Sequence, residues 1–176
     1  MNVVMVMAAS LNGKITRGRD SNIYSWTSKE DSELFFQLVE KHNLIVMGRK
    51  TYEAIRENIE LKPGKLRIVL TKNPQKFASN TVPGSLEFSN ETPRELLDRL
   101  ERKGYTEMLL AGGGEVNALF LKSSLVDELH LTIEPVIFGT GKALISDEKL
   151  EVSLKLISVK KLNKKGTLHL RYKVQK

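Results

Sequence analysis

Cysteine is absent from this 176-residue chain. Its absence excludes disulfide frameworks, thiolate-ligated metal sites and cysteine nucleophiles. Long hydrophobic runs are missing too, since no apolar stretch approaches the ~20 residues that span a bilayer. The short apolar segment at residues 2–9 has no basic flank before it, so it predicts a first strand and no signal peptide. We therefore expect a cytoplasmic protein without a membrane partner.

Several catalytic signatures are missing as well. No serine lies in a G-x-S-x-G setting, which leaves hydrolase chemistry without support. His42, His130 and His169 have no metal-ligand spacing to one another, so no metal site is expected. We interpret His169 as a residue on the polar, solvated face of its strand. The length favours a single domain over residues 1–176.

Acidic residues are absent from residues 152–176, which carry eight of the 28 basic side chains. Apolar and polar residues alternate over 167–174, which predicts a half-buried strand with its charges in water. Asn163-Lys164-Lys165-Gly166 supplies the turn before that strand. A solvated hairpin is favoured over the alternative, a nucleic-acid-binding tail that would hold phosphates through the same lysines.

Hydrophobic patterning predicts strands that alternate with helices. Apolar runs predict strands at 2–9, 44–47, 66–70, 85–88, 108–111, 126–138, 153–162 and 167–175. Helices are expected from near Ser28, after Gly48, from Thr92 to about 103, and over 115–122. This order predicts a three-layer α/β sandwich: a mixed, mostly parallel sheet flanked by helices and ending in a C-terminal β-hairpin.

Three consecutive glycines, Gly112 to Gly114, separate a predicted buried strand from a helix. Glycines let a ligand approach the backbone closely, and a helix N-terminus offers free N–H groups to a phosphate. A tight turn is the alternative, although such a turn usually needs one glycine. The segment matches neither the G-x-G-x-x-G fingerprint nor a P-loop. We favour an anion-binding turn.

Cations and hydroxyls follow two other predicted strands. Gly48 is followed by Arg49 and Lys50, and the strand at 66–70 is followed by Thr71-Lys72. Ligands of open α/β sheets bind at the carboxyl ends of the strands, where these groups would meet. The pattern indicates one ligand with several phosphates, with scattered surface cations as the alternative.

Asp31 lies in the first turn of the helix that starts near Ser28, one turn before Phe35. An exposed acid at this place would simply favour the helix dipole. If Asp31 instead faces an apolar cleft, desolvation would raise its pKa and let it donate protons near neutrality. Both alternatives stay open from the residues alone.

Taken together, these segments resemble the dihydrofolate reductase superfamily over nearly the whole chain. Two branches contribute. Ala9–Ile15, Leu125–Leu129 and Ile133–Gly139 are similar to the reductase domain of the riboflavin-biosynthesis deaminase-reductases. Trp26 with Asp31 and Phe35, and then Met47–Tyr52, resemble dihydrofolate reductase itself.

The resemblance implies NADPH as the cofactor and a homodimer as the assembly. It assigns cofactor binding to Ala9 and Ile15 at the nicotinamide, to Gly48, Arg49, Lys50 and Thr51 at the phosphates, to Thr71 and Lys72 at the 2′-phosphate, and to Gly112, Gly113, Gly114 and Glu115 at the pyrophosphate. It also implies a cis peptide between Gly112 and Gly113. Asp31 and Thr132 match the catalytic acid and its hydrogen-bond partner, and Asn12, Trp26 and Phe35 are the expected substrate contacts.

The activity that the resemblance implies is NADPH-dependent reduction of an imine-like C=N bond, with 5-amino-6-(5-phosphoribosylamino)uracil as the first substrate candidate. Dihydrofolate or another pterin is the alternative substrate, and a non-catalytic NADPH sensor is the alternative from another class. Lys65 stands where dihydrofolate reductases place the arginine that clamps folate, and lysine cannot form that bidentate fork. Ala111 stands where the riboflavin reductases usually have glutamate.

Overall fold

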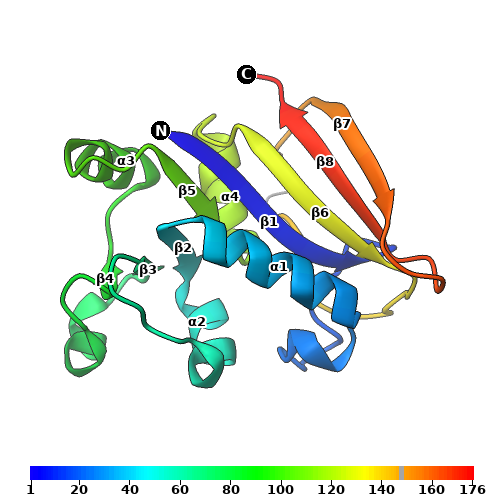
Figure 1. Ribbon diagram of the computed structural model, residues 1–176, viewed down its shortest axis with the longest axis horizontal. Helices are drawn as coiled ribbons and strands as arrows, with labels where there is room; N and C mark the ends of the chain where they lie inside the picture. The colour runs from blue at the N-terminus through cyan, green and yellow to red at the C-terminus, as the bar shows by residue number, and fades with distance from the viewer. Residues whose placement is uncertain (147–148) are drawn as a thin grey trace.

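The computed structural model describes residues 1–146 and 149–176. Within them the chain forms one eight-stranded sheet in the order β4-β3-β2-β5-β1-β6-β8-β7 (Figure 1). Strands β1 to β6 pair in parallel, whereas β8 is antiparallel to both β6 and β7. The strands are β1 (Asn2–Ser10), β2 (Leu44–Gly48), β3 (Leu66–Leu70), β4 (Leu86–Ser89), β5 (Glu107–Leu110), β6 (Glu128–Glu134), β7 (Leu154–Lys161) and β8 (Leu168–Val174).

Helices cover both faces of this sheet, which gives three layers. The helices are α1 (Lys29–Lys41), α2 (Arg49–Ile55), α3 (Pro93–Arg102) and α4 (Gly114–Lys122), with short 3-10 helices η1 (Ile23–Ser25), η2 (Arg56–Asn58) and η3 (Pro74–Asn80). Side chains of α1 and α2 pack on the face that carries Val4 and Ile45. Those of α3 and α4 pack on the opposite face, around Val3 and Met5. The predicted three-layer α/β sandwich with a mixed, mostly parallel sheet is confirmed.

Local capping chemistry sets where the helices begin. The Ser28 side chain accepts a hydrogen bond from the Asp31 N–H at 3.3 Å and so starts α1. Thr92 and Glu95 form a reciprocal capping box, and Pro93 occupies the first position of α3. Both starts agree with the sequence prediction. No helix of the described residues is long and apolar enough to cross a membrane.

Strand β6 ends at Glu134, four residues earlier than the prediction of a strand over 126–138. Proline has no N–H to donate to a ladder, and Pro135 follows directly. The chain then turns across the end of β1, where the Leu11 N–H donates to the Val136 carbonyl at 2.8 Å. The segment after β6 therefore covers the loop that follows β1.

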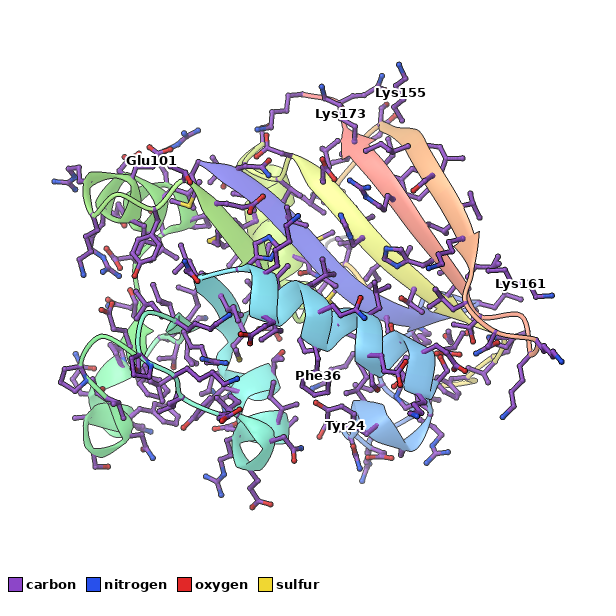
Figure 2. All side chains as sticks on the ribbon, in the orientation of Figure 1. Tyr24, Phe36, Glu101, Lys155, Lys161 and Lys173 are labelled. Atoms are coloured by element: carbon purple, nitrogen blue, oxygen red, sulfur yellow. The ribbon has the colours of Figure 1, made fainter. Side chains whose placement is uncertain are left out.

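The basic C-terminal segment forms the predicted hairpin. Every residue of β7 is exposed, and Lys155, Lys161 and Lys173 project from the hairpin in Figure 2. The Asn163 side-chain oxygen accepts from the Gly166 and Thr167 N–H groups and closes the turn.

The homodimer that the resemblance implies stays a prediction.

The prediction of a solvated His169 is wrong. This residue is 6% exposed, because its face of β8 is covered within the described structure and its ring lies near that of His130 on β6, with ring centroids 5.4 Å apart. The alternation of polar and apolar residues correctly assigned the two faces of β8. It could not show that the polar face is buried at Thr167 and His169 while Lys173 stays exposed.

The topology brings several loops to one edge of the sheet. The parallel strands β1, β2, β3, β5 and β6 all end on the same side. α1 and α2 lie on one face, whereas α3 and α4 lie on the other, so the chain changes face along the sheet. Crevices at such switch points are where open α/β sheets bind ligands.

Candidate functional site

A cavity of about 810 Å³ opens at this edge of the sheet. Its walls come from the ends of β1, β2 and β3, from α1 and from the start of α4. Tyr24, labelled in Figure 2, reaches it from η1, below α1 in that view. The volume lies within the range typical of small-molecule and cofactor sites.

One end of the cavity is formed by glycine backbone and is called the glycine end below. The Gly112–Gly113 peptide is cis, as the resemblance implied. The Gly48 N–H donates to the Gly112 carbonyl at 2.7 Å, which ties the end of β2 to this turn. A methyl group on Gly112 would lie 2.5 Å from the Met7 Sδ atom, so this position has no room for a side chain.

Gly113 and Gly114 leave the start of α4 open to the cavity. Among the described residues, no side chain caps this nine-residue helix, so its first N–H groups have no side-chain partner there. A Cβ on Gly113 would enter the cavity beside Thr51 Oγ1 at 3.4 Å and Ile15 Cδ1 at 3.7 Å. The space that a side chain would fill is therefore a cradle between the Thr51 and Ile15 side chains and the start of α4, with the geometry that suits an anion.

Four cations surround the glycine end: Arg49, Lys50, Lys72 and Lys142. Arg49 pairs with Glu53 at 2.6 Å, and Lys50 pairs with Glu115 at 2.7 Å. Lys142 was not predicted, because it lies in the irregular segment after β6 and no pattern marked it. Thr71 also lines the cavity here. The cluster has the charge and donors that a ligand with several phosphates requires.

Asp31 lines the opposite end, called the acid end below, and is the one buried residue of α1. The pKa of its carboxyl group is raised to about 6, mainly by burial; a hydrogen bond with Thr132 opposes this rise, and the neighbouring Glu134 adds to it. The sequence left two alternatives open for Asp31, an exposed acid and an acid in an apolar cleft; the structure contains the second. A carboxyl group with this pKa can hold and release a proton near neutrality.

Thr132 on β6 contacts Asp31, and His169 on β8 contacts Thr132. The Thr132 Oγ1 atom lies 3.4 Å from His169 Nδ1, and both residues line the cavity. Burial, together with the charges of His130, Arg171 and Lys160, lowers the pKa of His169 to about 4. This imidazole is therefore neutral at pH 7. Only the β6–β8 register, which pairs Thr132 with His169, reveals this neighbour.

Glu134 anchors the acid end and was not predicted from residue chemistry. It is 3% exposed and accepts hydrogen bonds from the Ser28 N–H and from the Thr167 hydroxyl, both at 2.7 Å. Ser28 caps α1, so Glu134 fixes the helix start that carries Asp31. One carboxylate thus joins β6, β8 and α1 around the site.

Replacing Glu134 with alanine should destabilise the fold by roughly 2–6 kcal/mol, since two donors lose their acceptor and each costs ~1–3 kcal/mol when left unpaired. Denaturant unfolding monitored by circular dichroism measures this change. The Glu134→Gln variant is the matched control, because its amide oxygen still accepts one of the two bonds. A Glu134→Ala protein as stable as its parent would contradict the anchoring role.

Most predicted site residues line this cavity, but several do not. Residues that were predicted and do line it include Ile15, Asp31, Phe35, Thr132, and the groups Gly48–Thr51, Thr71–Lys72 and Gly113–Glu115. Ala9 and Gly112 stand outside the lining, where Ala8 and Gly113 contact the cavity instead.

Asn12 and Trp26 are not brought to the cavity. The Asn12 side chain pairs with the backbone of Phe138, donating to its carbonyl at 2.7 Å and accepting from its N–H at 3.2 Å. Trp26 packs edge-on against the Phe138 ring, with centroids 5.3 Å apart. Both residues hold the loop after β6 in place. Lys65 also points away, toward the backbone carbonyls of Val39 and Glu40 and the carboxylate of Glu40.

Comparison with known families gives a match over most of the chain. The family model of the RibD C-terminal domain matches residues 1–168. An uncharacterised protein of Bacillus subtilis, YwjB, is 29% identical over 174 residues, which cover 94% of this chain and 95% of that protein. Both matches therefore extend over nearly the whole chain.

Solved structures share the fold. A pyrimidine reductase-like protein of Corynebacterium diphtheriae superposes with a TM-score of 0.81 at 21% identity, covering 99% of this chain and 92% of that one. Dihydrofolate reductase of Enterococcus faecalis, in a complex with NADP(H) and RAB-propyl, superposes with a TM-score of 0.66 at 21% identity. That match covers 99% of this chain and 97% of the reductase.

Proposed function

The chain belongs to the RibD C-terminal domain family, and from this premise we propose that it is an NADPH-dependent reductase of a pyrimidine- or pterin-type heterocycle. The observation that carries the proposal is the layout of one cavity. At the glycine end, four cations surround a cradle at the start of α4. At the acid end lies Asp31, a buried acid whose pKa is raised. A reductase needs both ends in the same cavity.

The residues at the glycine end fit the phosphates of NADPH. Gly113 and Gly114 with the start of α4 would receive the pyrophosphate, and Arg49, Lys72 and the Thr71 hydroxyl would hold the 2′-phosphate. The E. faecalis reductase with the same fold was solved with NADP(H), which supports this cofactor class. When bound, NADPH supplies the hydride that reduces the substrate.

The acid end would serve the substrate. Reduction of a C=N bond adds a hydride to the carbon and a proton to the nitrogen, and protonation makes the carbon more electrophilic. Asp31 holds such a proton near neutrality because burial raises its pKa to about 6. Thr132 orients the Asp31 carboxyl group, and the apolar side chains of Phe35 and Ile55 exclude water from this end.

A sensor that binds NADPH without turnover would need the glycine end alone. Burying a carboxyl group beside Glu134 costs free energy, and a pure binding site gains nothing from it. Strongly shifted groups in cavities are typical of catalysis. This cost favours the enzyme over the sensor.

Calorimetric titration of the purified protein with NADPH and, separately, with NADH tests the cofactor half of the proposal. We expect NADPH to bind at least about tenfold more tightly, since a single charge-assisted contact to the extra phosphate is worth ~1.5–3 kcal/mol. Equal affinities would contradict the assignment of Arg49, Thr71 and Lys72 to the 2′-phosphate. If neither dinucleotide binds, the reductase proposal falls.

A further inference from the structure

Charge is segregated along the cavity. All four lining cations, Arg49, Lys50, Lys72 and Lys142, belong to the glycine end. At the acid end, among the described residues that line it, the charged side chain is Asp31 and there is no lysine or arginine. Two carboxylates outside the acid end also line the cavity: Glu115, which pairs with Lys50, and Glu91, which pairs with Arg99. The lining away from the acid end therefore keeps an excess of cations, whereas the acid end has a carboxyl group and no cation.

The wall of the acid end is built from apolar groups and hydroxyls. Ile23, Phe35 and Ile55 supply the apolar surface. Hydroxyl groups line the same end, from the loop after β1, from η1 and from α1: Ser21, Tyr24, Thr27 and Ser32. Hydroxyls can donate to and accept from a polar side chain, but they bring no charge to neutralise an anion.

Two cations outside the cavity, Lys65 and Arg17, are held by other groups. The Lys65 ammonium group is 11% exposed and contacts backbone carbonyls at the C-terminus of α1 and the Glu40 carboxylate. The Arg17 guanidinium lies against Asp20 and the Ser25 hydroxyl, at 3.5 and 3.2 Å. Neither residue lines the cavity.

The start of α1 does not offer an anion site either. The Ser28 hydroxyl already accepts from the Asp31 N–H, and the Ser28 N–H donates to Glu134. Two carboxylates, Asp31 and Glu134, also lie at this helix start. A phosphate or carboxylate placed here would meet negative charge and find the first donors occupied.

We propose that the substrate of this reductase is a heterocycle whose side chain is uncharged and hydroxylated, without a phosphate or a carboxylate. The inference rests on the proposed function and narrows its substrate class. The reducible C=N bond would lie at Asp31: it is in the ring of a dihydropterin, and in a ribosylamino-pyrimidine it joins C1′ of the opened ribose to the exocyclic nitrogen. The hydroxylated chain would lie along the Ser21, Thr27 and Ser32 hydroxyls and Tyr24. A ribosylamino-pyrimidine without its phosphate and a hydroxyalkyl dihydropterin both have this chemistry.

The test uses two probes that differ only in the phosphate: 5-amino-6-ribosylaminouracil and its 5′-phosphate ester. NADPH oxidation is followed with each probe, and kcat/KM is compared. A parallel pair, 7,8-dihydrobiopterin and 7,8-dihydrofolate, sets a hydroxylated side chain against a carboxylated one. We expect the uncharged member of whichever pair is reduced to be favoured by about tenfold or more, which is a difference of ~1.4 kcal/mol.

A variant of Ile55 tests the charge preference of the acid end independently of which heterocycle is reduced. Ile55→Arg adds a cation to the acid end, and Ile55→Met is the matched control that keeps an uncharged side chain of similar size. The arginine variant should shift the kcat/KM ratio toward the anionic probe by about tenfold. The methionine variant should leave that ratio near the parental value.

The outcomes separate the two proposals. A parental preference for the phosphate ester or for dihydrofolate overturns the uncharged-substrate inference and leaves the reductase proposal standing. An unchanged ratio in Ile55→Arg also counts against the inference. If none of the four probes is reduced although NADPH binds in the calorimeter, the assigned heterocycle class is wrong, and both proposals fall together.

Discussion

Replacing Asp31 with asparagine is expected to reduce turnover about 10²- to 10³-fold and to leave the affinity for NADPH unchanged. Asparagine keeps the size of the side chain but has no proton to release to the substrate nitrogen. Asp31 lies at the acid end of the cavity, away from the glycine end that would hold the cofactor. Steady-state kinetics and calorimetry on the same preparation measure the two quantities.

The same substitution should make the protein more stable near pH 8. Burial raises the pKa of Asp31 from 3.8 to about 6, so its stabilising contribution is full below about pH 4 and is lost as the pH rises through 6. At pH 8 the parent holds a buried carboxylate, at a cost of up to roughly 3 kcal/mol that the asparagine variant avoids. The stability gain should disappear as the pH falls toward 4.

Glu30→Gln is the matched control, because Glu30 occupies the same first turn of α1. Its carboxylate is half-buried and accepts from the Asn163 side chain at 3.1 Å, outside the cavity. Its loss should leave turnover near the parental value. If Asp31→Asn turns over at the parental rate, Asp31 has no part in the mechanism. If both variants lose activity equally, the effect belongs to the helix and not to the buried acid.

The second large effect concerns cofactor choice. We expect the double substitution of Arg49 and Lys72 by alanine to weaken NADPH roughly 10- to 100-fold and NADH by much less. Both cations line the glycine end, and only NADPH carries the additional phosphate that they would neutralise. Binding of each dinucleotide is measured by calorimetry at fixed ionic strength, because salt screens exposed charges.

Lys76→Ala provides the control for nonspecific loss of positive charge, since Lys76 is exposed on η3 and does not line the cavity. This variant should bind both dinucleotides like the parent. Equal losses of NADPH and NADH in the double variant would show that the two cations do not read the 2′-phosphate. A loss in Lys76→Ala as large as in the double variant would point to general electrostatic attraction instead.

Much of the fold is predictable from local chemistry. The serine cap at Ser28, the capping box at Thr92 and the apolar run at 66–70 each specify an element through neighbours in the sequence, and all agree with the structure. The glycine end was predictable for a related reason. Its donors and cations directly follow strands, and parallel strands bring such positions to one edge.

The acid end was less predictable because it depends on pairings distant in sequence. His169 faces Thr132 only through the β6–β8 register, and Glu134 reaches Ser28 across more than a hundred residues. Lys142 comes from an irregular loop with no periodicity to place it. Asn12 and Trp26 contact Phe138, which is also distant in sequence, and do not line the cavity. Their role as substrate contacts stays a prediction.

The most direct test of the central claim is NADPH oxidation by the purified protein with an uncharged heterocycle, measured from pH 5 to 9. We expect NADPH consumption that depends on the heterocycle and declines as the pH rises through the pKa of Asp31, which is about 6 in the free protein. The Asp31→Asn variant should lose that decline together with its turnover. A protein that binds NADPH but consumes none with any pyrimidine or pterin probe would contradict the claim.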